Sequence, residues 1–126
     1  MSKQTYHPDR GDIIHLNLAP SAGHELTRPH FALVISTVRF SKATGFAILV
    51  PGTTKYHADQ RLASQQLMVK LPPIPRLSQE GWLYPHQVES LDYRDRAVSF
   101  VAKVDDDFLI DVMERVRAFI DPDSAI

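Results

Sequence analysis

The chain has 126 residues, 44% of them hydrophobic and 23% charged, with a formal net charge of −1, which excludes a disordered polymer and predicts one folded domain over residues 1–126. It contains no cysteine, which excludes disulfides and thiolate metal sites and favours a reducing compartment. The polar start lacks the apolar run of a signal peptide, and no apolar stretch approaches the ~18 residues needed to cross a bilayer, so we expect a cytoplasmic protein with no membrane association.

The first half of the chain contains three predicted strands. Residues 13–18 alternate apolar and polar side chains with a period of two, which is typical of a half-buried strand. Residues 31–36 and 46–50 are short apolar runs bounded by Pro or Gly, and these predict core strands. Residues 37–45, between those two runs, are interpreted as a polar connection.

The second half adds further short strands and one helix. Residues 67–71 alternate again before Pro72, Pro73 and Pro75, which prevent a continuing ladder, and residues 82–84, 88–91 and 97–101 are the last strand candidates. Apolar residues then recur every three or four positions from Phe108 to Ile120, which predicts an amphipathic helix with Asp105 to Asp107 at its start and Pro122 after its end. Together these elements predict a mainly β (α+β) protein that forms a compact barrel.

Two polar loops stand next to predicted core strands. The first holds His24, Glu25 and Arg28 directly before the strand at 31–36, and Pro29 restricts Arg28 to an extended backbone. The second, Pro51 to Lys55, follows the strand at 46–50 and contains Thr53 and Thr54. Loops at the ends of neighbouring strands can form one site.

Charge is divided unevenly along the chain. Residues 1–76 hold nine Lys or Arg and four Asp or Glu, a sum of +5, whereas residues 77–126 hold five and eleven, a sum of −6. Phosphate binding depends on local positive potential, so a polyanion would prefer the first part. An ordinary mixed surface divided by chance gives the same count, and charge alone leaves both interpretations open.

Four short motifs occur in a fixed order along the chain: Gly11-Asp12-Ile13 opening a strand, Arg28-Pro29 before residues 31–36, Pro51 to Thr54 after a strand, and Gly81 to Val88 with Gln87. In these motifs the chain resembles the MazF/PemK family of toxin endoribonucleases. The resemblance implies an SH3-like β-barrel with short helical additions and a C-terminal amphipathic helix, a homodimer, a cognate antitoxin as partner, and sequence-specific cleavage of single-stranded RNA. It also implies that Arg28 and Thr53 are catalytic, with Glu25 as the acidic residue of the first loop.

Cleavage of RNA by its own 2′-hydroxyl needs a base, stabilisation of a doubly charged phosphorane, and an acid for the departing 5′-oxygen. Arg28 can hold two phosphate oxygens and the Thr53 hydroxyl can donate one more hydrogen bond. Glu25 is the candidate base, and His24 or His86 the candidate acid. This chemistry requires no metal, and we expect neither a metal nor a cofactor. The predicted substrate-binding residues are His24, Thr54, Lys55, His86 and Gln87.

Other interpretations remain open from the residues alone. Tyr56, Trp82 and Tyr84 are candidates for stacking on RNA bases, although core packing competes for Trp82. A toxin of related fold that inhibits a protein such as DNA gyrase would not need the Arg-Pro and Thr-Thr elements. A barrel that only binds nucleic acid, without cleaving it, is the third interpretation.

Overall fold

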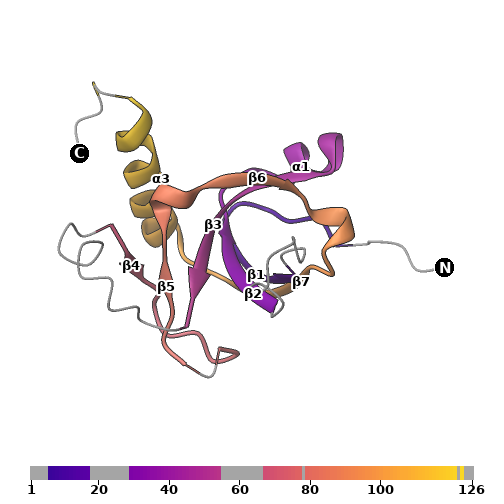
Figure 1. The fold of residues 1–126 in the computed structure, drawn as a ribbon, viewed down its shortest axis with the longest axis horizontal. Helices are drawn as coiled ribbons and strands as arrows, with labels where there is room; N and C mark the ends of the chain where they lie inside the picture. Colours follow the sequence, from indigo (N-terminus) through magenta and orange to yellow (C-terminus); the bar gives the residue numbers. More distant parts are fainter. Residues whose placement is uncertain (1–5, 18–28, 55–66, 78, 122, 124–126) are drawn as a thin grey trace, which may run out of the picture.

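The computed structural model describes residues 6–17, 29–54, 67–77, 79–121 and 123 of the chain. In this part, seven antiparallel strands form one sheet in the order β4-β5-β3-β2-β1-β7, with β6 also paired to β3 (Figure 1). The elements are β1 (Asp12–Asn17), β2 (Pro29–Val34), α1 (Val38–Thr44), β3 (Phe46–Thr53), β4 (Val69–Lys70), β5 (Trp82–Leu83), η1 (Pro85–Gln87), β6 (Glu89–Asp92), η2 (Tyr93–Asp95), β7 (Ser99–Lys103) and α3 (Asp106–Ile120). The predicted mainly β class with a C-terminal helix is confirmed.

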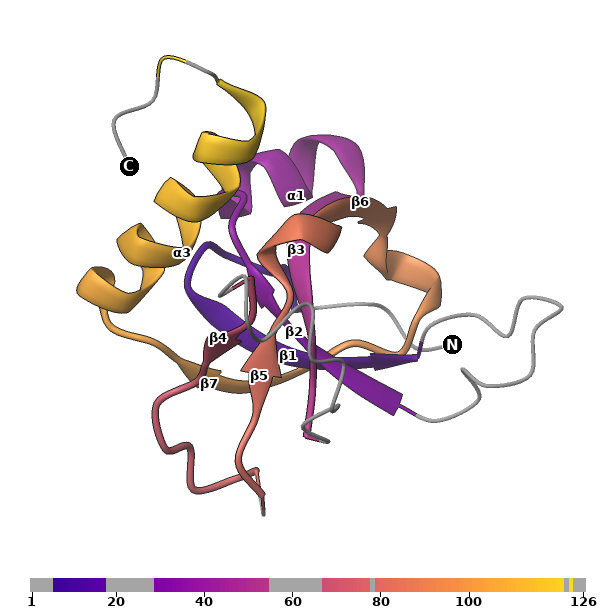
Figure 2. The same cartoon turned by 60° about the vertical axis from the view of Figure 1, so that its left-hand side comes forward.

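The two faces of the sheet bury two separate apolar clusters, because successive side chains of a strand point to opposite faces. One cluster joins Ile13, Leu33 and Val50 to Leu109 and Val112 of α3. Figure 2 shows α3 packed beside the sheet. The other cluster contains Ile14, Ala32, Val34, Ala47, Leu49, Leu91, Tyr93 and Val98, which lie on the face turned away from α3. The alternation therefore decides which side chains of each strand face α3.

Helix α3 begins and ends close to the predicted positions. Asp105 is its N-cap, and the Asp105 carboxylate accepts a hydrogen bond of 3.0 Å from the backbone N–H of Phe108. Asp106 and Asp107 occupy the first turn, where negative charge interacts favourably with the helix dipole. Burial of Leu109, Val112 and Val116 attaches the helix to the sheet.

The segment interpreted as a polar connection contains a helix, so that interpretation is wrong. Helix α1 starts after Thr37, whose hydroxyl accepts a hydrogen bond of 3.2 Å from the N–H of Phe40. It ends at Gly45, whose backbone is left-handed with φ of 78°. Both caps are visible in the sequence, but seven residues give too short an apolar stripe to reveal a helix by periodicity.

The strand pairings do not close the sheet within the described residues. Strands β4 and β7 form the two ends of the strand order. A side chain partly bridges the opening, because Nη1 of Arg76 donates to the carbonyl oxygens of Phe100 at 2.9 Å and Val101 at 3.4 Å in β7. The predicted SH3-like barrel is therefore a curled, open sheet in the described residues. At its β7 end, Arg76 donates hydrogen bonds to two backbone carbonyl groups.

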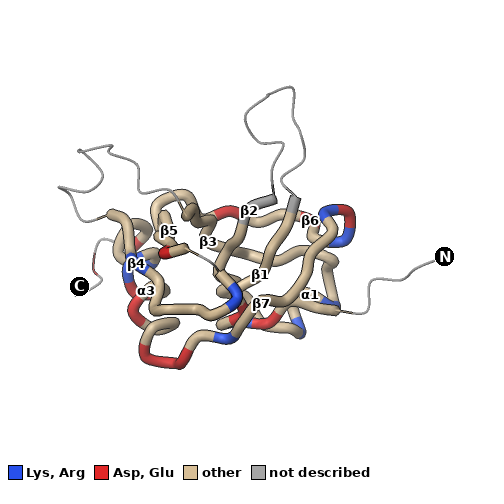
Figure 3. The backbone as a smooth tube through the Cα atoms, turned by 90° about the horizontal axis from the view of Figure 1, so that it is seen from below, with Lys and Arg blue, Asp and Glu red and all other residues tan. Residues whose placement is uncertain are grey.

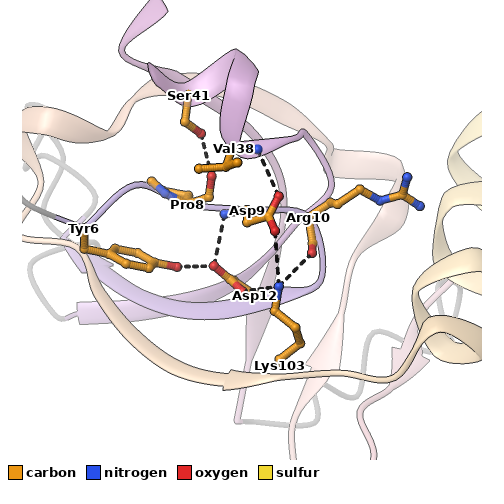
Figure 4. A network of polar contacts seen from close by, with 8 residues as sticks. All are labelled: Tyr6, Pro8, Asp9, Arg10, Asp12, Val38, Ser41 and Lys103. Atoms are coloured by element: carbon orange, nitrogen blue, oxygen red, sulfur yellow. Dashed lines mark hydrogen bonds and ion pairs between the residues drawn. The ribbon is translucent and has the colours of Figure 1, made fainter. Parts of the chain in front are cut away.

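A buried carboxylate fixes the start of β1 (Figure 4). Asp12 is 3% exposed, and its carboxylate accepts hydrogen bonds from the Tyr6 hydroxyl and, at 3.0 Å, from the N–H of Asp9. Nζ of Lys103 lies 3.0 Å from the same carboxylate and 3.4 Å from that of Asp9. Burial alone would lower the pKa of Lys103, but the hydrogen bonds and charges of Asp12 and Asp9 outweigh it and raise that pKa.

This network also positions α1. The Asp9 carboxylate accepts a hydrogen bond of 2.9 Å from the N–H of Val38, the first residue of the helix, and Ser41 donates 2.7 Å to the carbonyl of Pro8 (Figure 4). The Gly11-Asp12 element therefore has a structural role: it ties together the beginning of β1, β7 and α1.

No helix within the described residues is long and apolar enough to cross a membrane.

Candidate active site

The register of β2 and β3 places the beginning of one strand beside the end of the other. Phe31 is paired with Gly52, and the antiparallel pairing continues through Ala32 and Pro51 to Val34 and Leu49. Strand β2 starts at Pro29, and β3 ends at Thr53. Pro29, which directly follows Arg28 in the chain, therefore lies at the same end of the sheet as the predicted catalytic Thr53.

Strand β3 runs three residues further than predicted, because Pro51, Gly52 and Thr53 belong to the strand and not to a loop. The carbonyl of Pro51 accepts a hydrogen bond of 2.9 Å from the N–H of Tyr84. Gly52 allows a close approach of its neighbours: a Cβ atom there would overlap the ring of Phe31 and lie 2.7 Å from the carbonyl oxygen of Trp82. A larger residue would push β2 and β5 away from Thr53.

Thr53 lies in a row of three side chains that crosses three strands. Trp82 of β5 is paired with Thr53 on one side and with Lys70 of β4 on the other. Thr53 and Trp82 are half-buried, and Lys70 is exposed. Nζ of Lys70 lies 6.0 Å from the centre of the Trp82 ring and 3.1 Å from the carboxylate of Glu80. The register thus places Thr53 next to Trp82, and Lys70 next to Trp82 on its other side.

The predicted binding residues His86 and Gln87 belong to η1, between β5 and β6. Because the N–H of Tyr84 bonds to Pro51, Tyr84, the residue before η1, lies roughly 7 Å back along β3 from Thr53. Nδ1 of His86 is buried without a hydrogen-bond partner among the described residues, and Nε2 of His86 lies 3.5 Å from the amide nitrogen of Gln87. The His86 ring also meets the Tyr84 ring edge-on, with centres 6.0 Å apart.

Several predicted site residues lie outside the described residues: His24, Glu25, Arg28, Lys55 and Tyr56. Their roles stay predictions, as do those of Thr53, Thr54, His86 and Gln87. Thr54 is half-buried and directly follows β3. Within the described part of the chain, no three His, Asp or Glu side chains gather where they could hold a metal ion.

Acidic residues of the second half concentrate around α3. Asp105, Asp106 and Asp107 form a continuous run at the start of this helix (Figure 3), and Asp111 and Glu114 follow within it. Lys70 belongs to the basic first part and stands in the same row as Thr53. Among the described Lys and Arg residues, Lys70 is therefore the one that strand pairing places in the same row as Thr53.

The sequence and the fold of the chain match a known family of small toxins. Residues 9–120 match the sequence model of the PemK-like, MazF-like toxins of type II toxin-antitoxin systems. Because the match covers most of the chain, the protein belongs to this family. No curated protein sequence matches the chain.

Solved structures support the same assignment. A crystal structure of MazF from Deinococcus radiodurans is 29% identical, covers 91% of this chain and 97% of its own, and has a TM-score of 0.73. A MazE-MazF complex from the same organism is 27% identical with the same coverage and a TM-score of 0.74. An endoribonuclease in complex with its cognate antitoxin from a mycobacterial species is 15% identical, covers 88% of this chain and 92% of its own with a TM-score of 0.63, and shares the fold.

Sequence reasoning missed the row formed by Thr53, Trp82 and Lys70. Core packing was a competing interpretation for Trp82, but its side chain belongs to neither buried cluster in the described structure. The alternation of Trp82, Leu83 and Tyr84 was a usable signal, since a buried Leu83 requires its two neighbours to point to the other face. The pairing with Lys70 had no local signal, because it joins residues twelve positions apart across a proline-rich connection.

Proposed function

We propose that the protein is a toxin endoribonuclease that cuts single-stranded RNA at specific sequences without a metal ion. The observation that carries this proposal is the pairing of Phe31 with Gly52, which brings the strand following Arg28 and the strand ending at Thr53 to one end of the sheet. Membership of the MazF-like toxin family supports it. A guanidinium and a hydroxyl delivered from neighbouring strand ends can contact one phosphodiester.

In the proposed reaction, the 2′-oxygen of the RNA attacks the adjacent phosphorus and the bond to the 5′-oxygen breaks. The products are a 2′,3′-cyclic phosphate and a 5′-hydroxyl. Arg28 and Thr53 bind the phosphoryl oxygens as negative charge accumulates on them, and Glu25 accepts the proton of the 2′-hydroxyl. His24 or His86 donates a proton to the departing oxygen. Thr54, Lys55 and Gln87 contact the substrate.

The proposed partners follow from the relatives. The MazE-MazF complex of Deinococcus radiodurans, at 27% identity, supports an antitoxin that neutralises this chain. The family resemblance supports a homodimer and a cytoplasmic location. A dimer also provides the extended surface that a single-stranded RNA needs, since one 14.3 kDa domain offers little length for binding.

The test is to incubate the purified protein with a long natural RNA in the presence of EDTA, and to map the cut ends. We expect cuts at a short recurring sequence, with new 5′-hydroxyl ends that polynucleotide kinase labels without prior phosphatase treatment. Arg28→Ala should abolish cleavage and growth inhibition while the circular dichroism spectrum is unchanged. Absence of cleavage in EDTA, or full activity of Arg28→Ala, would overturn the mechanism.

A further inference from the structure

The row that contains Thr53 lies on the face of the sheet opposite α3. In an antiparallel sheet, directly paired residues point to the same face, so Thr53, Trp82 and Lys70 share one face. The neighbouring row contains Gly52, Leu83 and Val69, and both Leu83 and Val69 pack into the cluster that includes α3. The Lys70 ammonium lies 6.0 Å from the Trp82 ring centre, which agrees with their position on one face.

Two aromatic side chains of β5 and its continuation stand on this face. Trp82 and Tyr84 are separated by the fully buried Leu83, and both are half-buried. Among the described residues, neither belongs to the two core clusters nor to the partly buried side chains packed against them. Trp82 and Tyr84 are therefore two partly exposed aromatic side chains on the same face as Thr53. A flat ligand can stack on such a ring.

The charge next to this surface suits a phosphate. Lys70 is held by Glu80, but the two side chains are 56% and 66% exposed, so the pair is well solvated and weak. An RNA phosphate can replace the Glu80 carboxylate at the ammonium at little cost. Trp82 separates Lys70 from Thr53 in the row, which leaves room for one nucleotide between a bound phosphate and the scissile phosphate.

We propose that Trp82, flanked by Tyr84, is a stacking platform for an unpaired RNA base next to the cleaved phosphate, and that Lys70 binds the phosphate on the far side of that base. The proposal rests on the proposed ribonuclease function and specifies how the substrate is held. Stacking explains a requirement for single-stranded RNA, because a base inside a duplex cannot present its face to the ring. It adds affinity without choosing a particular base.

The single tryptophan of the chain makes a direct experiment possible, because all tryptophan fluorescence comes from Trp82. The probe is a fully 2′-O-methylated RNA nonamer of randomised sequence, which lacks the attacking hydroxyl and is not cut. We expect its addition to quench the emission of the protein. The same nonamer annealed to its complements as a duplex should quench far less at equal concentration.

Variants test the contribution of each side chain, with binding followed by the anisotropy of a labelled nonamer. Trp82→Ala should weaken binding roughly 5- to 150-fold, the equivalent of the 1–3 kcal/mol that one stacked base contributes, whereas Trp82→Phe should retain most of the affinity. Lys70→Gln should weaken binding and reduce the salt dependence by about one phosphate contact. Phe46→Ala is the matched control, since Phe46 is 38% exposed at the opposite end of β3.

The outcomes separate this inference from the proposed function. Quenching with loss of affinity in Trp82→Ala supports the platform even if no RNA is cut. If the protein cuts RNA but the nonamer leaves the emission unchanged, or if a folded Trp82→Ala binds as tightly as the parent, the platform is overturned while the ribonuclease stands. Thermal unfolding of Trp82→Ala and Trp82→Phe provides the folding control. If the alanine variant does not fold, the quenching of the parent protein by the single-stranded nonamer, compared with the duplex, still decides the question.

Discussion

Gly52 lies directly opposite Phe31 between β3 and β2, so close that a Cβ atom at position 52 would overlap the phenyl ring and lie 2.7 Å from the carbonyl oxygen of Trp82. The absence of a side chain at this position therefore sets the spacing of β2, β3 and β5 around Thr53. The ring could rotate, but the carbonyl belongs to the β5 backbone and cannot move without disturbing the ladder.

Gly52→Ala should consequently destabilise the fold by about 1–3 kcal/mol, the usual cost of overpacking, and reduce RNA cleavage at temperatures where the variant is still folded. Urea unfolding followed by circular dichroism measures the first effect. Ser90→Ala is a suitable control, because Ser90 is exposed on β6 and also paired with β3. Equal stability of both variants would contradict the close packing at Gly52.

Removal of the Thr53 hydroxyl should slow cleavage without unfolding the protein. Thr53→Val keeps the shape of the side chain at the end of β3 but cannot donate a hydrogen bond to the phosphorane. The loss of one such donor typically costs 10² to 10³ in rate, roughly 2.7–4 kcal/mol. Single-turnover cleavage of an RNA with one mapped site is the measurement. Thr53→Ser restores a hydroxyl and should recover most of the rate; if it is as slow as Thr53→Val, the hydroxyl is not the important group.

The buried Asp12 should be important for stability and unimportant for catalysis. Asp12→Ala removes the acceptor of the Tyr6 hydroxyl and of the Asp9 N–H, and the ion-pair partner of Lys103. We expect a loss of about 1–3 kcal/mol, because the Tyr6 hydroxyl and the Asp9 N–H lose a buried acceptor, whereas the Lys103 ammonium, on a side chain that is 50% exposed, stays in contact with water. Asp111→Ala removes the exposed pair with Arg115, at 3.2 Å, and should cost less than about 1 kcal/mol. A comparable loss in the two variants, measured by urea unfolding, would refute this role of Asp12.

Stability should fall in acid partly through Asp92. The side-chain and backbone hydrogen bonds from Arg94 lower the pKa of Asp92 from 3.8 to about 2. Because the folded pKa lies below that of the unfolded chain, the ionised carboxylate stabilises the fold above about pH 4, and this contribution is lost as the pH falls toward about 2. The melting temperature of Asp92→Asn should therefore depend less on pH in that window. Since the Asp92 side chain is partly exposed, the difference should shrink in 1 M NaCl, and an identical pH profile for parent and variant at low salt would contradict the assignment.

Several features were determined by the sequence alone. The strand cores, the C-terminal helix with its Asp105 cap, and the proline-rich interruption all follow from periodicity and local chain preferences, which act over a few residues. Helix α1 was not predicted, although Thr37 and Gly45 mark both of its ends. Seven residues are too few for a helical period to be recognised in the apolar positions. The extension of β3 to Thr53 was missed because Pro and Gly disfavour strands locally, and only the neighbours β2 and β5 make the strand favourable there.

Only the tertiary structure decided which side chains stand beside Thr53. The sequence predicted that the loops next to two core strands meet at one site, and the pairing of β2 with β3 places the corresponding strand ends together. It did not predict the row from Thr53 through Trp82 to Lys70, because that row depends on the register of three strands. Register is set by long-range pairing and by the buried face of each strand, and a shift of one residue would turn every one of these side chains to the opposite face.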